Sequence, residues 1–568
     1  MTDKYLVAIE ISKKQNYIFK SNKLKENIGA SLIIKYVTED LPKKYLYENN
    51  GEIVFQGGGG SFFKFEKKEN ATDFIKELSF KIMREYPEIE FFASYVDYTN
   101  EVEGEKEVRK KISDKKLARQ SRFKKVSFGV EEICRTSGLP ANSRINDGKG
   151  IRAVSIDTEK KFTCGKNKDN KLGILDIIQK DLEDIKEVDL GKIKKKYKFS
   201  EFKSEEYDFP YDLDKFKKEG NSKLAVVAID GNGMGDMVDK LKVSFENNQE
   251  NYFNKLKEFS DGIDKCYKDA FKKVVEVIEN NKKSEENEDG IEFLGNKYIP
   301  IRPIILAGDD VCYIVESSIA LETANIFIKE LEKISGKFIG ELGIELGVKK
   351  LTACGGIAFV NKKYPFFKAC ELAEGLCNNA KTKIKKINEK FKEKEKEING
   401  KSKNKETVIK EISMLDWHIS KGELSNDIKE IRKRYENLKY TYIDREEKEK
   451  EMIADYNIKP IFISGENDLK KYQLSYIKFK EMIKKLKDNR RSKLKELINE
   501  IPNGKSSVDL FIEKYKLEKL FLDLDKCIFE EENEKSIFRK VGKNEIILYY
   551  DALEIMDDFK ELKEGENQ

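Results

Sequence analysis

An apolar segment that ends in an acid and runs directly into a glycine-rich turn is the first chemical feature of this sequence. Residues 223–230 read Lys-Leu-Ala-Val-Val-Ala-Ile-Asp, and the turn is Gly231-Asn232-Gly233-Met234-Gly235. A carboxylate in this position is suited to hold a divalent metal ion, and glycines let backbone N–H groups approach phosphates. We predict that Asp230 and Gly231 bind metal and that the five turn residues contact a nucleotide. Such a turn by itself is a weak signal.

A second acidic feature follows about 80 residues later, where Ala307-Gly308-Asp309-Asp310 separates two apolar segments. Taken alone, this stretch is most simply an ordinary hairpin turn. If the hairpin lies beside the strand that ends in Asp230, three carboxylates converge on one point. That ligand set suits two Mg²⁺ or Mn²⁺ ions in phosphoryl or nucleotidyl transfer. We predict Asp230, Asp309 and Asp310 as catalytic metal ligands, with Gly308 as a further nucleotide contact.

Two basic residues need separate interpretations. Lys381, in a helix expected from Tyr364 to about Ile384, is placed to neutralise a triphosphate, although a solvated lysine explains it equally well. His418 is the one histidine of the chain. A chain with one histidine cannot form sites that need two imidazoles, such as those of HD phosphohydrolases and HExxH metalloproteases. We expect His418 to be a packed residue without a catalytic role.

The composition indicates a large chain with several cores and a charged surface. It has 568 residues, 39% hydrophobic and 38% charged, and its 110 basic and 105 acidic residues leave a net charge of +5. At roughly 100–200 residues per domain, about three to five domains are expected. Eight scattered cysteines form no CxxC pair, and no run of about 18 apolar residues occurs. We therefore expect free thiols, no membrane contact and a cytoplasmic location.

The elements that must position these residues form the same pattern twice. Residues 4–95 predict a β-α-β-β-α-β unit with a Gly57–Gly60 turn at its hairpin, and residues 223–384 repeat the order. From about residue 421 the pattern predicts a helical bundle, with long helices at 429–455 and 475–500 and a last one near 545–563. The fold class is therefore α+β, with two ferredoxin-like Palm domains, a small intervening domain and a C-terminal helical bundle.

These elements divide the chain into four predicted segments. They are a degenerate first Palm at 1–97, an intervening mixed domain at 98–221, a catalytic second Palm at 222–420 and the helical bundle at 421–568. The first Palm is called degenerate because its Gly57–Gly60 turn has no acid. This turn occupies the hairpin position without metal ligands, so we interpret it as structural or as a second wall for a nucleotide.

With these motifs in place, the sequence resembles the large Palm-containing subunit of type III CRISPR-Cas effector complexes, the Cmr/Csm large subunit that makes cyclic oligoadenylates. Asp230–Gly235 is similar to the family's D-x-D/N-x-M-G turn, and Ala307–Asp310 to its GGDD hairpin. Residues 354–365 and 369–381 resemble the strand and helix that follow the hairpin. Residues 10–31 and 549–556 are similar to the opening of the first Palm and the closing helix of the terminal bundle.

The sequence departs from that family at three places. Ala307 replaces the first glycine of GGDD, which adds one methyl group at the start of the turn. The family's N-terminal HD nuclease is expected to be absent. Where the family often has four zinc-binding cysteines, Cys134 and Cys164 leave one at each half-site, so bound zinc is not expected.

The resemblance implies a metal-dependent nucleotidyltransferase that joins ATP into a cyclic oligoadenylate-type second messenger through 3′–5′ linkages. Its implied partners are ATP, the other subunits of the RNA-guided complex, and guide and target RNA. Two alternatives stay open: transfer of AMP to a different small-molecule acceptor, and a catalytically silent scaffold subunit. Clustered carboxylates argue against the scaffold because they repel one another without a metal ion. A free-standing GGDEF-like cyclase is disfavoured because it needs neither the first Palm nor the bundle.

Overall fold

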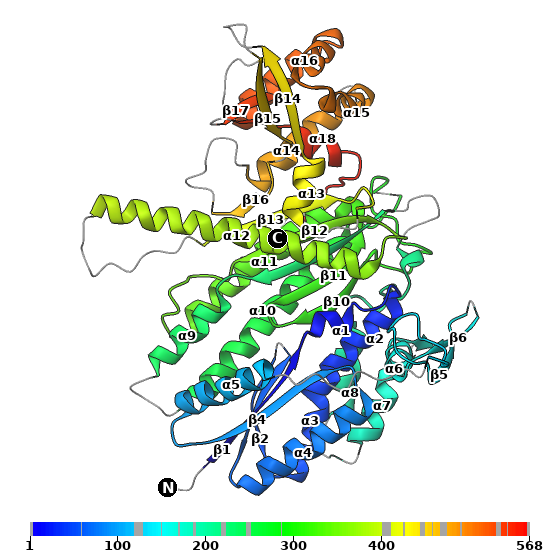
Figure 1. The fold of residues 1–568 in the computed structure, drawn as a ribbon, viewed down its shortest axis with the longest axis vertical. Coiled ribbons are helices and arrows are strands. Elements are labelled where there is room, and N and C mark those ends of the chain that lie inside the picture. Colours follow the sequence, from blue (N-terminus) through cyan, green and yellow to red (C-terminus); the bar gives the residue numbers. More distant parts are fainter. Residues whose placement is uncertain are drawn as a thin grey trace.

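The computed structural model shows an elongated chain in which the two Palm sheets follow one another along the long axis, with the C-terminal region beyond the second (Figure 1). It describes residues 4–57, 59–118, 129–148, 150–168, 171–183, 185, 189–216, 223–245, 251–285, 287–399, 411–423, 427–443, 449–456, 458–465, 474–488, 491–529, 536–541 and 544–564. In this part of the chain, no helix is both long enough and apolar enough to cross a membrane.

The first Palm is built on a four-stranded antiparallel sheet in the order β2-β3-β1-β4. Its strands are β1 (Lys4–Ser12), β2 (Glu52–Gly57), β3 (Gly60–Phe65) and β4 (Glu90–Tyr98). The helical segments between them are α1 (Lys14–Ile18), α2 (Leu24–Lys35), the π-helix η1 (Tyr36–Asp40), α3 (Leu41–Glu48) and α4 (Lys68–Glu85). The strand order confirms the predicted ferredoxin-like arrangement.

The second Palm repeats that order in a larger sheet, β10-β11-β9-β12-β13-β16. Its strands are β9 (Lys223–Gly231), β10 (Ile301–Ala307), β11 (Asp310–Glu316), β12 (Ala353–Asn361), β13 (Ser413–Ile419) and β16 (Ile461–Ser464). β9 pairs antiparallel with both β11 and β12 at the centre, and β13 joins β12 in parallel. β9 is almost wholly buried because neighbours cover both edges and helices pack against the sheet.

Amphipathic helices cover the second sheet. They are α9 (Met234–Ser244), α10 (Tyr252–Asn280), α11 (Ala320–Glu341) and α12 (Phe366–Asn399), and the 3₁₀ turn η4 (Ser317–Ile319) precedes α11. Gly356 of β12 lies against α12 so closely that an added Cβ would come within 2.0 Å of the Ala373 carbonyl oxygen. This close packing fixes α12, and therefore Lys381, relative to the ends of β9 and β12.

The segment between the two Palms contains short elements. They are α5 (Glu101–Leu117), β5 (Ser143–Asn146), β6 (Ile151–Val154), α6 (Ile156–Cys164), β7 (Asn167–Lys168), β8 (Lys171–Leu172), α7 (Gly173–Leu182), α8 (Leu190–Lys198), η2 (Ser200–Phe202) and η3 (Leu213–Lys215). The basic stretch 191–198 lies on α8, where Ile193 and Tyr197 are buried and the lysines lie between solvent and neighbouring acids.

The C-terminal region contains helices but also a sheet, which the sequence did not predict. Its helical segments are α13 (Ile428–Tyr435), α14 (Tyr476–Lys487), α15 (Arg491–Glu500), η5 (Ile501–Asn503), α16 (Lys505–Lys514), α17 (Glu518–Leu524), η6 (Asp525–Phe529) and α18 (Tyr550–Ile555). The strands β14 (Asn437–Ile443), β15 (Glu449–Asp455), β17 (Phe538–Val541) and β18 (Asn544–Ile547) form a sheet in the order β14-β15-β18-β17.

The long helix predicted at 429–455 was therefore wrong, whereas helices over 475–500 are confirmed as α14 and α15. Residues 437–443 read Asn-Leu-Lys-Tyr-Thr-Tyr-Ile, in which aromatic and β-branched residues favour a strand over a helix. Likewise, the last predicted helix is the strand β18 followed by the short α18. The many lysines and glutamates of this region obscured the alternation of apolar and polar residues that is typical of a strand.

Candidate active site

Asp230 and Asp310 occupy directly paired positions on neighbouring strands of the second Palm. Asp310 is the first residue of β11 and lies opposite Asp230 in β9, and Ala307 pairs with Asp310 across the turn of the hairpin. Paired residues in an antiparallel sheet place their side chains on the same face, with Cβ atoms about 4.5–5.5 Å apart. The hairpin thus brings the two predicted carboxylates together at one end of the sheet.

Asp309 lies at the tip of the hairpin and against the glycine turn that follows β9. A Cβ atom built on Gly231 would lie 3.2 Å from Cβ of Asp309 and 2.6 Å from the hydroxyl of Tyr267, a buried residue of α10. Gly308, with a φ of 62°, makes the left-handed bend of the turn and has open space around it. Gly231 therefore has no room for a side chain. Because glycine has none, Asp309 can approach Asp230.

The carboxyl groups are held at an electrostatic cost. Burial raises the pKa of Asp310 to about 6, and the charges of Asp230 and Asp309 add to the rise. Burial also raises the pKa of Asp309, with Asp230 as the next cause. Carboxylates that repel one another in a partly buried site are an arrangement that a bound cation relieves.

The glycine turn opens into the first turn of α9. Gly233 has a φ of 68° and is the residue before the helix, with no side chain to cap it. Gly235 has nothing within 4 Å of the position that a Cβ would take, so the first turn of α9 faces open space on that side. Backbone N–H groups at the start of a helix are donors suited to a phosphate.

Asn232 has a different role from its neighbours in the turn. Its side-chain amide donates to the hydroxyl of Thr352 and the carbonyl of Ile412, both at 3.1 Å. Its backbone N–H donates to the carbonyl of Thr352 at 2.8 Å. Both groups thus hold the turn against the residues that immediately precede β12 and β13, which indicates that Asn232 shapes the turn.

Lys381 reaches from α12 to the acid at the end of β9. Its ammonium group lies 2.6 Å from Oδ2 of Asp230 and donates to the carbonyl of Gly231 at 2.8 Å. The cavity beside it has a volume of about 590 Å³ and is lined by the whole glycine turn, Asp309, Lys240 and Lys385. A triphosphate in this cavity would meet three lysines, Lys240, Lys381 and Lys385, and the start of α9.

Glu374 is an acidic neighbour that the sequence analysis missed. It lies on α12, seven residues before Lys381 and hence on a similar face of the helix. Burial raises its pKa to about 7, and the charges of Asp310, Glu371 and Asp230 add to this. The seven-residue spacing from Lys381 was the sequence signal that could have identified Glu374.

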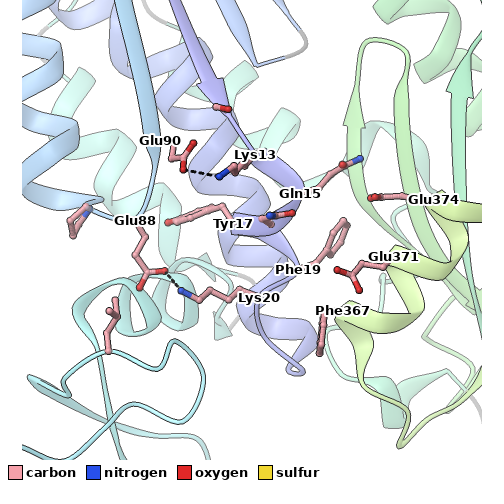
Figure 2. A pocket seen from close by; sticks show the side chains of 14 residues that line it. Lys13, Gln15, Tyr17, Phe19, Lys20, Glu88, Glu90, Phe367, Glu371 and Glu374 are labelled. Atoms are coloured by element: carbon pink, nitrogen blue, oxygen red, sulfur yellow. Dashed lines mark hydrogen bonds and ion pairs between the residues drawn. The ribbon is translucent and has the colours of Figure 1, made fainter. Parts of the chain in front are cut away.

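A second cavity, of about 670 Å³, lies between the first Palm and α12 (Figure 2). Residues of α1 and the following turn line one wall, and Phe367, Glu371 and Glu374 of α12 line the other. Figure 2 shows Gln15 and Glu374 pointing toward each other across this space. The two Palms thus face one another over a cavity whose wall contains Glu374, a neighbour of the carboxylate site.

The predicted metal ligands are neighbours but are not arranged as a closed metal site. Within the described ranges, no three histidine, cysteine, aspartate or glutamate side chains are grouped so that they could hold a metal ion. The convergence of all three carboxylates around metal ions therefore stays a prediction. In the present arrangement Lys381 engages one oxygen of Asp230.

The remaining residues singled out in the sequence lie away from the carboxylates. His418 is 3% exposed and lies between Glu423, at 2.8 Å from Nε2, and Glu436, at 3.0 Å from Nδ1, so its packed character is confirmed. Cys134 and Cys164 are both buried. The Cys134 sulfur lies 3.4 Å from the hydroxyl of Thr158, and Cys164 belongs to the main hydrophobic core.

Fold and site together define a Palm-type α+β domain with acidic residues and a cavity of about 590 Å³ at one end of its sheet. Residues 223–393 match the family model described as Cas10/Cmr2, second palm domain. This match confirms the predicted resemblance to the large Palm-containing subunit of type III CRISPR-Cas complexes. No curated protein sequence matches the chain.

The solved structures to which this chain is similar include a Csm1-Csm4 cassette in complex with cA4, at 13% identity and a TM-score of 0.39. Another is the same cassette in complex with AMPPNP, at 14% identity and a TM-score of 0.39. In both cases the similarity covers 67% of this chain and 53% of the other. The chain thus matches about half the length of these solved chains.

Proposed function

We propose that this chain is the nucleotidyltransferase subunit of a type III CRISPR antiviral complex and joins ATP into a cyclic oligoadenylate-type messenger. The observation that carries the proposal is the pairing of Asp310 with Asp230 beside the glycine turn and Lys381. This arrangement places acidic side chains, backbone N–H groups that can donate to a phosphate, and the lysine ammonium group at one end of the sheet. A scaffold has no use for partly buried carboxylates in which the charge of Asp230 raises the pKa of both Asp309 and Asp310.

The residues fit divalent cations in kind, since Mg²⁺ and Mn²⁺ prefer carboxylate oxygens and the three aspartates supply them. Asp230, Asp309 and Asp310 would hold the ions, with the carbonyl of Gly231 beside them. When bound, the ions supply positive charge at the transferred phosphate. Oδ2 of Asp230 and the carbonyl of Gly231 are both within reach of Lys381, so we infer that the lysine exchanges part of this contact for the nucleotide.

The chain's own groups then orient the reaction. The first turn of α9 and Lys381 bind the triphosphate of the donor ATP, which places its α-phosphorus toward the aspartates. The 3′-hydroxyl oxygen of an acceptor forms a new bond to that phosphorus. The bond from phosphorus to the pyrophosphate oxygen breaks, and the hydroxyl proton passes to solvent. Repetition of this transfer, followed by an intramolecular one, closes a ring.

The cavity between the Palms gives the acceptor its place. It adjoins the carboxylate site through Glu374, and it combines aromatic side chains with amides and carboxylates. Aromatic rings stack on nucleobases, and carboxylates accept hydrogen bonds from hydroxyl and amino groups. An acceptor other than a nucleotide is the alternative outcome, and the mass of the product distinguishes the two.

We further propose that the chain acts within an assembly of protein subunits with guide and target RNA, and that target RNA switches on synthesis. The family match of the second Palm supports this proposal. Among the similar structures is a Csm1-Csm4 subcomplex described as part of the type III-A CRISPR-Csm interference complex.

The test is to incubate the purified chain with ATP and either Mg²⁺ or Mn²⁺, alone and with its RNA-guided complex, and to identify products by mass spectrometry. Masses of cyclic adenylates with release of pyrophosphate are expected. A product in which AMP is joined to another molecule would show nucleotidyl transfer to a different acceptor, in place of cyclic adenylate synthesis. Unchanged ATP in every combination would contradict the proposal and favour the scaffold.

A further inference from the structure

We propose that the basic helix α8 and the first Palm form a binding site for single-stranded nucleic acid, separate from the carboxylate site. The site is a third cavity, of about 1080 Å³, which is lined by residues of α3, β2, α8 and α10. It shares no described residue with the two cavities described above. The inference does not depend on nucleotidyl transfer, and it gives the RNA of the proposed assembly a place on this chain.

The lysines that line this cavity outnumber its acidic residues. The lysines are Lys43 of α3, Lys192, Lys195 and Lys196 of α8, and Lys268 of α10. The acidic residues are Asp40, Asp189 and Glu201. Three separate helices thus contribute positive charge to one cavity. Such an arrangement favours a ligand that carries several phosphates.

α8 is anchored on the first Palm by its buried side, which contains Ile193 and Tyr197. The hydroxyl of Tyr197 donates to Oδ2 of Asp40 at 2.7 Å. The same fully buried carboxylate pairs with Lys43 at 2.7 Å and with Lys196 at 3.3 Å. Asp40 therefore fixes the position of α8 and holds two of the cavity lysines in place.

The helical period divides the lysines of α8 into two sets. Lys192, Lys195 and Lys196 are spaced i, i+3 and i+4, so they share the face that borders the cavity. Lys194 and Lys198 are spaced i and i+4 on another face, and they line none of the cavities described above. The basic stretch of the sequence thus directs only part of its charge into the cavity.

Two lysines of the cavity face are available to a ligand. The side chain of Lys192 is 88% exposed, and its contact with Asp189 is 3.9 Å long. An exposed pair at this distance contributes little, so a phosphate can replace Asp189 at small cost. Lys195 is also exposed and makes no ion pair with any residue that the structure describes.

An exposed aromatic ring lines the same cavity. Tyr47 of α3 is 60% exposed, which leaves much of its ring open to a ligand. Single-stranded nucleic acid uses both features, because a base stacks on the ring while lysines contact the phosphates. An acidic protein segment would use the lysines alone, and the bases of a duplex are not free to stack. The combination therefore favours a single strand.

The first experiment measures binding of a fluorescein-labelled oligouridylate to the full chain by fluorescence anisotropy, over a range of salt concentrations. An oligothymidylate of the same length and a double-stranded RNA are the comparison probes. The double variant Lys192→Gln with Lys195→Gln is compared with Lys194→Gln with Lys198→Gln, which removes equal charge from the same helix. Thermal unfolding checks that both variants are folded.

The salt dependence of binding reports the number of phosphate contacts. Each lysine–phosphate contact with a single strand contributes about 0.7 to the slope of log K against log salt concentration. The loss of two contacts at Lys192 and Lys195 should reduce the slope by about 1.4, which weakens binding about 25-fold at about 0.1 M salt. The control pair, Lys194 and Lys198, should leave both quantities nearly unchanged.

A second set of variants tests the aromatic ring. Tyr47→Ala should weaken binding of the single strand by about five- to hundredfold without changing the salt slope, because stacking releases no ions. Tyr47→Phe keeps the ring and should bind as wild type does. Phe80→Ala is the matched control, since Phe80 of α4 is also 60% exposed but lines none of these cavities.

The outcomes separate this inference from the proposed nucleotidyl transfer. Binding of a single strand that depends on Tyr47 and on the cavity lysines supports the inference, even if the wild type does not react with ATP. The tighter of the two single-stranded probes shows whether the ligand is RNA or DNA.

Three results would overturn the inference and leave nucleotidyl transfer untouched. They are no binding of either single strand by wild type, equal weakening by the two lysine pairs, and displacement of oligouridylate by polyglutamate together with unchanged binding in Tyr47→Ala. The last result would make the cavity a docking surface for an acidic protein.

Discussion

The ammonium group of Lys381 lies 2.6 Å from Oδ2 of Asp230 and donates to the carbonyl of the next residue, Gly231, at 2.8 Å. One side chain of α12 thus engages the end of the central strand at the point where the glycine turn begins. In a site with three neighbouring carboxylates, this cation keeps Asp230 in place before any nucleotide arrives.

Lys381→Met should therefore weaken the use of ATP. The loss of a charged contact to the triphosphate predicts a fall of about tenfold or more in kcat/KM, carried mainly by KM, and Lys381→Arg should recover part of it. Steady-state assays of product formation give both constants. Lys368→Met, on the same helix and paired with Glu371 at 3.0 Å, is the matched control. Equal effects of the two methionine variants would remove Lys381 from the site.

Substitution of two glycines of the same turn should affect different properties, stability at Gly231 and ATP binding at Gly235. At Gly231 a Cβ atom would lie 2.6 Å from both the Met234 methyl group and the Tyr267 hydroxyl, so Gly231→Ala should destabilise the second Palm by about 1–3 kcal/mol. At Gly235 the space is open, so Gly235→Val should cost less stability but weaken ATP binding by crowding the first turn of α9.

Thermal unfolding and calorimetric titration of ATP, with Mn²⁺ and with a chelator, check both glycine variants. Wild type should bind ATP only with the divalent ion. If Gly235→Val bound ATP as wild type does, the turn would not be a phosphate site.

The buried histidine predicts a pH-dependent stability that is unrelated to the active site. Burial lowers the pKa of His418, but hydrogen bonds to Glu423 and Glu436 outweigh this and raise it above the ordinary 6.5. Its stabilising contribution is therefore full below pH 6.5 and declines as the pH rises through the folded-state pKa. Burial raises the pKa of Glu423, but the hydrogen bond from His418 lowers it to about 2, so the glutamate contributes above its ordinary 4.5.

His418→Gln should consequently cost about 3 kcal/mol near pH 6 and less at pH 9. Urea unfolding followed by the fluorescence of Trp417 measures this, because the single tryptophan is fully buried next to His418. A loss that is the same at both pH values would mean that His418 is not charged in the folded protein.

The sequence was sufficient to predict the parts of the site that depend on local patterns. Asp230 lies near the end of an apolar strand, and Asp309 and Asp310 lie at the turn of a hairpin. The ferredoxin-like strand order is therefore sufficient to bring β9 and β11 together. Lys381 was identified because it lies on the helix after the last Palm strand.

Other features of the fold and the site could not be predicted, because they depend on tertiary contacts or because the composition obscures the strand pattern. Gln15 and Glu374 line the same cavity but are more than 350 residues apart in the sequence, and no local pattern links them. The strands β14 and β15 lie in a Lys/Glu-rich stretch whose charges suggested a helix. In both cases the missing information was which distant segment covers the element, which a single sequence does not contain.

We propose that the acids of the β10-β11 hairpin serve nucleotidyl transfer, and the double variant Asp309→Ala with Asp310→Ala tests this role most directly. Pyrophosphate release from ATP is measured for wild type and variant in the assembled complex with Mn²⁺, after confirming by thermal unfolding that the variant is folded. We predict release by wild type and a fall of at least about a thousandfold in the variant, whose fold is retained because both residues lie at a turn. Equal release by the two proteins would contradict the account.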